Sequence, residues 1–145
     1  VRHWEIPYAR LTDTTPTPTN AAEVTSVLPG TQLTGTILSV DAGRSIAVID
    51  FTNSMVYRHD VRNVLTYSTG SESTFGAINI GDPVYYDNSA TMPAGVYLST
   101  SPLDNTGAAN TLFGFAVADD IASDTFPKGG ATASTQRVAV MQRGA

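Results

Sequence analysis

Cysteine is absent from this chain of 145 residues, and charged residues make up only 14% of it. Without cysteine the protein forms no disulfide, has no thiolate nucleophile and binds no zinc through sulfur. Its stability must therefore come from packing or from association. Globular chains carry about 25% charged residues on average, so this surface is covered largely by Thr, Ser, Asn, Gly and Ala. Such a surface loses few charge–water contacts when a partner buries it.

Cations are scarce as well. Lys and Arg together number 8, and the formal net charge is −5. Nucleic-acid binding draws its affinity from clustered cations that neutralise phosphates, so the composition argues against a nucleic-acid partner. No apolar run reaches the roughly 18–20 residues of a membrane span, and residues 1–5 do not begin a secretory signal. We expect a protein that is made in the cytoplasm and has no membrane partner.

The length is sufficient for one hydrophobic core. A chain of this size buries about 68–70% of its unfolded surface, and 41% of the residues are hydrophobic. A change of composition near residue 30 divides the chain in two. We expect an extended N-terminal arm over residues 1–30 and a β domain over residues 31–145.

The arm is predicted from alternation and from proline. Apolar side chains alternate there with polar or small ones, and two prolines follow in a Thr-rich stretch. Each proline lacks an N–H and biases the residue before it towards extended geometry, so we expect no helix across residues 12–20. Residues 21–28 fit either a helical turn or a short strand. The candidate interaction residues are the apolar and proline side chains of this arm: Trp4, Ile6, Tyr8, Pro16 and Pro18.

Two interpretations of Trp4 and Tyr8 remain open at this point. In the first, these side chains cover the domain's own core. In the second, they anchor the arm on a neighbouring subunit, because aromatic side chains provide a large contact area at low entropic cost.

Short strands separated by Gly-containing turns fill the rest of the chain. Strands are expected at residues 32–40, 45–51, 55–57, 61–67, 81–87, 96–99, 111–118 and 136–141. The first two flank a turn at residues 41–44 and predict a hairpin. The strand spacing and the lack of a 3.6-residue apolar period indicate a mainly β fold, a small β-barrel or β-sandwich domain with an extended N-terminal arm.

One strand is marked by proline. Pro83 is compatible with the first position of a strand, where its missing N–H need not break a ladder. Val84 and Tyr86 should then face one way and Tyr85 the other.

A second strand is marked by glycine. Phe113, Phe115 and Val117 are expected to line one of its faces. Gly114, between the two phenylalanines, predicts a close backbone approach or a bend in a barrel.

Residues with catalytic potential are few. The pair His59-Asp60, together with Asp50, suggests a hydrolase arrangement, but a triad is defined by geometry and no G-x-S-x-G motif is present. We interpret His59 as a half-exposed histidine in a turn. The acidic residues at 119, 120 and 124 lack the spacing of a calcium loop, and the glycine turns lack the spacing of a phosphate-binding loop. The sequence therefore predicts no catalytic residue, no metal site and no cofactor.

Three segments carry a resemblance to a known family. They are Ile80-Gly81-Asp82-Pro83-Val84-Tyr85-Tyr86, Leu112-Phe113-Gly114-Phe115-Ala116-Val117 and Val138-Ala139-Val140-Met141. Roughly residues 75–143 resemble small proteins that are encoded beside the capsid genes of tailed bacteriophages and are regarded as capsid decoration, or cement, proteins. In that family a strand that begins with G-D-P-V is followed by an F-G-x-A/V strand and by a final short valine strand.

The resemblance implies a function by binding alone. It implies a virion protein on the outer surface of the capsid, expected as a homotrimer, whose partner is the major capsid protein. There it would bridge capsid subunits and reinforce the expanded shell, with no catalytic residue and no small-molecule substrate. The alternatives are another virion structural module or a carbohydrate-binding β module of a tail or fibre, and a small hydrolase built on a β-barrel.

Overall fold

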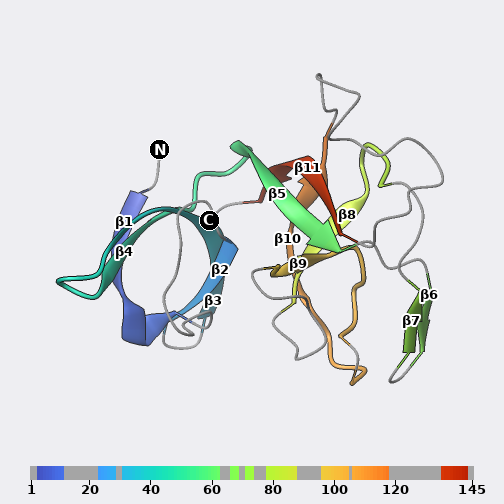
Figure 1. Cartoon of the computed structure of the whole chain (residues 1–145), viewed down its shortest axis with the longest axis horizontal. Coiled ribbons are helices and arrows are strands. Elements are labelled where there is room, and N and C mark those ends of the chain that lie inside the picture. The colour runs from blue at the N-terminus through green and yellow to red at the C-terminus, as the bar shows by residue number, and fades with distance from the viewer. Residues whose placement is uncertain are drawn as a thin grey trace.

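The computed structural model describes residues 3–11, 23–28, 31–62, 66–68, 71–73, 78–87, 96–104, 106–117 and 135–143. Across these residues the protein is a four-stranded sheet, a closed five-stranded barrel and a two-stranded sheet (Figure 1). The mainly β class is thus confirmed, and the barrel is the form it takes. Within the described parts there is no helix with the length and hydrophobicity needed to cross a bilayer.

The four-stranded sheet has the order β1-β4-β3-β2 and is antiparallel throughout. Its strands are β1 (His3–Pro7), β2 (Glu23–Leu28), β3 (Thr31–Asp41) and β4 (Ile46–Asp50), and a short 3-10 helix, η1 (Tyr8–Arg10), follows β1. The β3–β4 hairpin is the one predicted from the turn at residues 41–44. The sheet is strongly curled (Figure 1), and one apolar cluster packs in it: Ile6, Leu11, Ile37, Ala47, Ile49 and Phe51.

The described parts of residues 1–30 belong to this sheet. β1 pairs with β4 and β2 pairs with β3, so the range predicted as an extended arm supplies both edge strands. Of the two alternatives for residues 21–28, the described part, Glu23–Leu28, is a strand. Ile6 and Leu11 are buried in the sheet's core. Pro16 and Pro18 lie outside the described residues.

The barrel closes in the order β10-β11-β5-β9-β8. Its strands are β5 (Val56–Arg62), β8 (Pro83–Tyr86), β9 (Leu98–Ser99), β10 (Thr111–Ala116) and β11 (Thr135–Gln142). Only β5 and β9 are parallel neighbours. Its interior is a second apolar cluster: Val61, Ile78, Val84, Leu98, Phe113, Ala116, Val138 and Val140. A separate hairpin pairs β6 (Thr66–Ser68) with β7 (Ser71–Ser73).

The proline strand follows its prediction. Pro83 is the first residue of β8, Val84 and Tyr86 are buried, and Tyr85 is only half-buried. Each side chain therefore takes the side that alternation assigned to it.

The glycine strand follows its prediction only in part. The register between β10 and β8 shifts between Leu112 and Gly114. Because of this bulge Phe113 and Gly114 are both buried, the alternation inverts, and Phe115 is 36% exposed. The expectation that Phe113 and Phe115 share a face is therefore wrong. The close approach at Gly114 is confirmed, since a Cβ placed there would lie 2.1 Å from the Met141 carbonyl oxygen.

One further expectation is corrected in β5. Strands are predicted at residues 55–57 and 61–67 with a polar turn between them, whereas Val56–Arg62 is one continuous strand with no turn. Residues 63–65 lie outside the described residues, and Thr66 and Tyr67 belong to β6. His59 is not a half-exposed turn residue: it lies in mid-strand and is 1% exposed. The sequence of this strand shows no alternation of polar and apolar residues, because the inward position 59 is occupied by a histidine, which is a polar residue type.

Replacing Gly114 by alanine should destabilise the protein by about 2–4 kcal/mol, because the new Cβ meets the backbone of β11, which cannot move without disturbing the barrel. The matched control is Gly43→Ala in the β3–β4 turn, where the new Cβ lies 3.4 Å from the Asp41 carboxylate, and this change should stay within about 0.5–1 kcal/mol. Urea unfolding followed by circular dichroism measures both. Similar losses in the two variants would contradict the close approach at Gly114.

Candidate functional site

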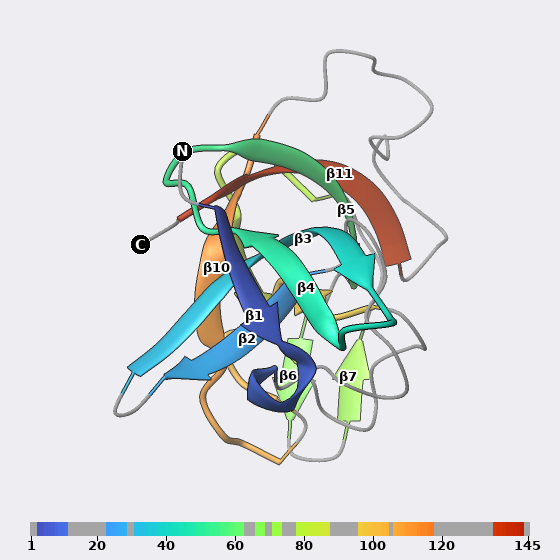
Figure 2. The ribbon, with the colours of Figure 1, turned by 90° about the vertical axis from the view of Figure 1, so that its left-hand side faces the viewer.

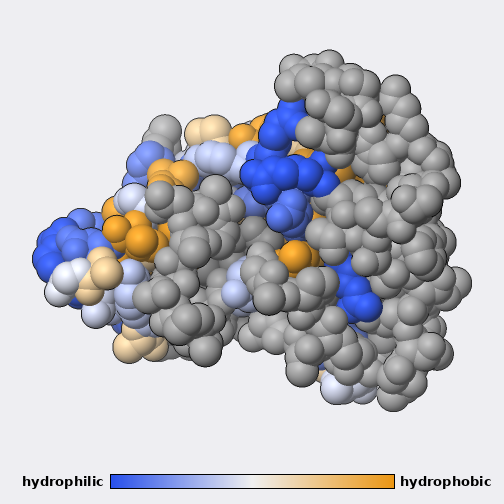
Figure 3. Space-filling model, viewed as in Figure 1, coloured by the Kyte–Doolittle hydropathy of each residue, from blue (hydrophilic) through white to orange (hydrophobic). Residues whose placement is uncertain are grey.

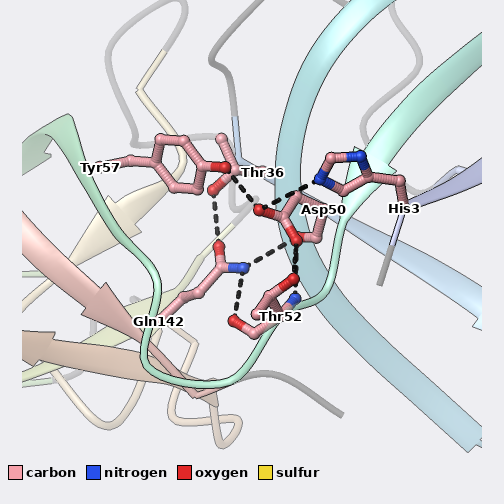
Figure 4. A network of polar contacts seen from close by, with 6 residues as sticks. All are labelled: His3, Thr36, Asp50, Thr52, Tyr57 and Gln142. Carbon is pink, nitrogen blue, oxygen red and sulfur yellow. Dashed lines mark hydrogen bonds and ion pairs between the residues drawn. The ribbon is translucent and has the colours of Figure 1, made fainter. Parts of the chain in front are cut away.

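Buried and half-buried polar side chains join the sheet to the barrel. We call this group the polar seam; it comprises Thr36, Asp50, Thr52, Tyr57, His59 and Gln142. Thr36 and Asp50 are cross-strand partners in β3 and β4, on the face opposite Ile37 and Ile49. The chain leaves the sheet after Asp50 and enters the barrel at β5, and Gln142 reaches this junction from the end of β11 (Figure 4).

Gln142 is bonded through both its side chain and its backbone. Its side-chain Nε2 donates to the backbone carbonyls of Asp50, at 2.9 Å, and Thr52, at 3.0 Å. Its Oε1 accepts a hydrogen bond of 2.8 Å from the Thr36 hydroxyl. Its backbone N–H donates to Met55, and its carbonyl accepts from Ser54, both at 2.8 Å. A backbone carbonyl can only accept a hydrogen bond, so the atom of Gln142 that faces the two carbonyls must be the amide nitrogen. The orientation of the side-chain amide is therefore fixed.

This orientation determines the hydrogen bond of His59. The one hydroxyl proton of Thr36 is given to Gln142, so at 3.3 Å the Nε2 of His59 is the donor and Thr36 Oγ1 the acceptor. The other side of the imidazole contacts the barrel core, with its ring 5.4 Å from the Phe113 ring in an edge-to-face arrangement. His59 thus joins the polar seam to the apolar interior of the barrel.

Asp50 is the buried charge of the seam. Its carboxylate accepts hydrogen bonds from the Thr52 hydroxyl, the Thr52 backbone N–H and the Tyr57 hydroxyl, and its Oδ2 lies 3.8 Å from the Nε2 of His3. Burial raises the pKa of this carboxyl, but the hydrogen bonds from Thr52 and Tyr57 and the His3 imidazole outweigh that effect and hold the pKa below its usual value of 3.8. Asp50 is therefore ionised at neutral pH.

Tyr57 shows the reciprocal effect. Burial, its hydrogen bond to Asp50 and the negative charge of that carboxylate together raise the pKa of Tyr57 to about 12. The phenol therefore stays a neutral donor throughout the physiological range.

The structure does not bring His59 and Asp60 together. As neighbours on one strand they point to opposite sides, with His59 buried and Asp60 at the surface, 3.4 Å from Arg137 Nη1. The Asp50 carboxylate is held by Thr52, Tyr57 and His3. In the part of the chain that the structure describes, no three His, Asp or Glu residues gather in a way that could hold a metal ion. The hydrogen bonds of the polar seam hold the four-stranded sheet and the barrel in one alignment.

The predicted interaction residues separate into two groups. Ile6 is 7% exposed and Tyr8 packs against the same core, so these two cover the domain's own interior. Trp4 is 57% exposed, on the edge strand β1, and is open to a partner.

Sequence reasoning missed the polar seam. A signal for it was present, since His59 and Gln142 continue the inward alternation of Tyr57 to Val61 and of Val138 to Val140. No local pattern, however, links residue 142 to residue 36.

Comparison with known proteins supplies no relative: no family model, no curated protein and no solved structure matches this chain.

Replacing Gln142 by leucine should destabilise the protein by about 3–5 kcal/mol, because the carbonyls of Asp50 and Thr52 would lose their donor and the buried Thr36 hydroxyl would lose its acceptor. The control is Asp60→Ala, which removes the exposed pair with Arg137 on the same two strands and should cost less than about 1 kcal/mol. Denaturant unfolding measures both. A leucine variant as stable as the alanine control would show that the seam does not hold the two units together.

The Tyr57 pKa gives a prediction at alkaline pH. Because the folded pKa of about 12 lies above the ordinary value of 10.0, this hydrogen bond contributes its full stability below pH 10 and loses it as the pH rises towards 12. When the pH is raised rapidly to a series of alkaline values, the ultraviolet absorbance of tyrosinate should include a component that titrates near pH 12. Tyr57→Phe should abolish that component, whereas Tyr85→Phe should leave it in place. Persistence of the component in Tyr57→Phe would contradict the assignment.

Proposed function

We propose that this protein is a capsid decoration, or cement, protein that binds the outer surface of a phage head, bridges major capsid subunits and stabilises the expanded shell. It acts as a homotrimer, by binding alone, without a cofactor or a small-molecule substrate. The observation that carries the proposal is the placement of the three motif segments, which lie on β8, β10 and β11, three consecutive strands of one barrel.

The motifs form one packing unit. Pro83, from the G-D-P-V segment, is opposite Phe115 in the register of β8 and β10. Gly114, from the F-G segment, leaves no room for a Cβ against the backbone of β11. Val138 and Val140, from the last segment, fill the barrel core. Order and spacing along the sequence therefore correspond to neighbours in space, which supports treating the three motifs as a single resemblance.

The surface is suited to repeated weak contacts. Trp4 exposes an aromatic side chain on β1, and this strand is an edge of its sheet, where a partner's backbone can add. Many such contacts around a shell gain strength from multivalency.

The carbohydrate-binding alternative has less support. A sugar site needs exposed aromatic rings grouped in a pocket. The stacked pair in the described residues, Tyr86 and Tyr97, has ring centroids 6.5 Å apart, but Tyr86 is only 6% exposed.

Co-sedimentation with purified expanded heads that lack decoration tests the proposal. The wild-type protein should bind until a fixed number of copies per head is reached. Trp4→Ala should weaken binding about tenfold or more, because a large exposed aromatic anchor is lost. Leu103→Ala, which trims an exposed apolar side chain in a loop of the barrel, is the control. A truncation is less informative, since it removes Ile6 and Leu11 from the core.

Two results would overturn the proposal. One is the absence of saturable binding to expanded heads. The other is binding on a glycan array by a protein that ignores the heads, which would favour the carbohydrate-binding module.

A further inference from the structure

Four arginines lie on the outer face of the β5–β11 ribbon. Alternation along β5 turns Tyr57, His59 and Val61 inward, so its even-numbered residues point outward. The register with β11 places Arg137 opposite Asp60, Ala139 opposite Arg58 and Met141 opposite Val56, on that same outer side. Arg58 and Arg62 on β5 and Arg137 on β11 point outward, and Arg143 follows directly after β11.

This face has the opposite charge to the rest of the chain. It holds four of the 8 cations, and among its described residues one carboxylate, Asp60. Its net charge is therefore +3, and since the whole chain carries −5, the remainder carries −8. Arg137 is paired with Asp60, and Arg58 and Arg62 also interact within the chain. The backbone that carries Arg58, Arg62 and Arg137 is fixed by the continuous antiparallel pairing of β5 with β11.

A row of apolar side chains adjoins the arginines. Val56 is opposite Met141, Met141 is opposite Phe115, and Phe115 is opposite Pro83, so the row crosses four neighbouring strands. Val56 is 48% and Phe115 36% exposed. β5 and β11 run side by side along one side of the molecule (Figure 2). One of the strongly hydrophilic groups of the surface lies over them, with hydrophobic residues nearby (Figure 3).

An apolar row with arginines beside it is the composition of a protein interface. Interfaces are enriched in Arg, Met and aromatic residues and depleted in Lys, and every cation on this face is Arg. Single-stranded nucleic acid would need a basic groove with several stacking aromatic rings, whereas this face offers the one exposed ring of Phe115.

We infer that the outer face of β5 and β11, with the apolar row of Val56, Met141, Phe115 and Pro83, docks onto an acidic surface of a second copy of this chain. The excess negative charge outside this face makes a second copy complementary to it. Pairing of the face with itself is disfavoured because it would bring arginines together. The contact is therefore heterologous: this face of one copy meets a different surface of the next, as in a cyclic ring.

The inference specifies how the proposed homotrimer is held together, and to that extent it rests on the proposed function. Its test needs only the purified protein, without heads. Failure of self-association and failure of head binding are therefore separate results.

Sedimentation equilibrium of the full chain over a concentration series, at low and at high salt, tests the inference. Reversible self-association should be present and should weaken as salt screens the charges. Arg143→Glu and Phe115→Gln should each weaken it about tenfold or more. The matched controls are Arg44→Glu, which makes the same charge change on an exposed side chain of the β3–β4 turn, and Leu103→Gln, whose side chain is 36% exposed like that of Phe115. Circular dichroism verifies that each variant is folded.

Persistence of association in both controls and its loss in Arg143→Glu and Phe115→Gln would support the inference. Three results would overturn it: a wild-type chain that is monomeric at every concentration, equal weakening in Arg143→Glu and Arg44→Glu, or association unchanged in Arg143→Glu. If Arg143→Glu weakened head binding or oligonucleotide binding while association stayed intact, the occupant of the face would be the shell or a nucleic acid and not a second copy.

Discussion

The side-chain amide of Gln142 is the contact on which the two β units depend. Where the chain passes from sheet to barrel, the carbonyls of Asp50 and Thr52 are shielded from water and need a hydrogen-bond donor from the protein. The side-chain NH2 group of Gln142 donates to both. The same side chain accepts from Thr36, 106 positions away in the sequence. An unpaired buried carbonyl costs about 1–3 kcal/mol, so the sheet and the end of β11 are stable in this arrangement only together.

The buried charge of Asp50 adds a constraint of alignment. An isolated carboxylate would be expensive to bury, and it is tolerated here because Thr52 and Tyr57 donate to it. These donors come from the connection between the units and from β5, whereas the carboxylate belongs to β4. Apolar clusters pack in many orientations of similar energy, but a set of directed donors and acceptors is satisfied in one. The polar seam therefore gives two separate apolar cores a unique mutual placement.

Local patterns predicted much of the fold. The β3–β4 hairpin, the start of β8 at Pro83 and the close approach at Gly114 all follow from effects that act within a few residues. What the sequence concealed depends on distant partners. Phe115 is turned outward by a bulge that exists only against β8, and the ring N–H of the buried His59 finds its hydrogen-bond acceptor in Thr36, 23 positions away. Among the predicted interaction residues, Ile6 is buried in a core that forms only when β1 pairs with β4. Trp4, on the same strand, is exposed.

The inner and outer sides of β5 and β11 have different roles that are physically linked. Alternation places His59 and Gln142 inside on the same strands whose outer side carries Arg58 and Arg137, and Arg143 follows directly after β11. Hydrogen bonds on the inner side fix the position of both strands, so the outer side chains start from a rigid base. Docking onto such a face loses little backbone entropy, and more of the contact energy is retained as affinity. The proposed function, in which the protein is held in place by repeated contacts, would benefit from this arrangement, because the polar seam preorganises the outer face of β5 and β11.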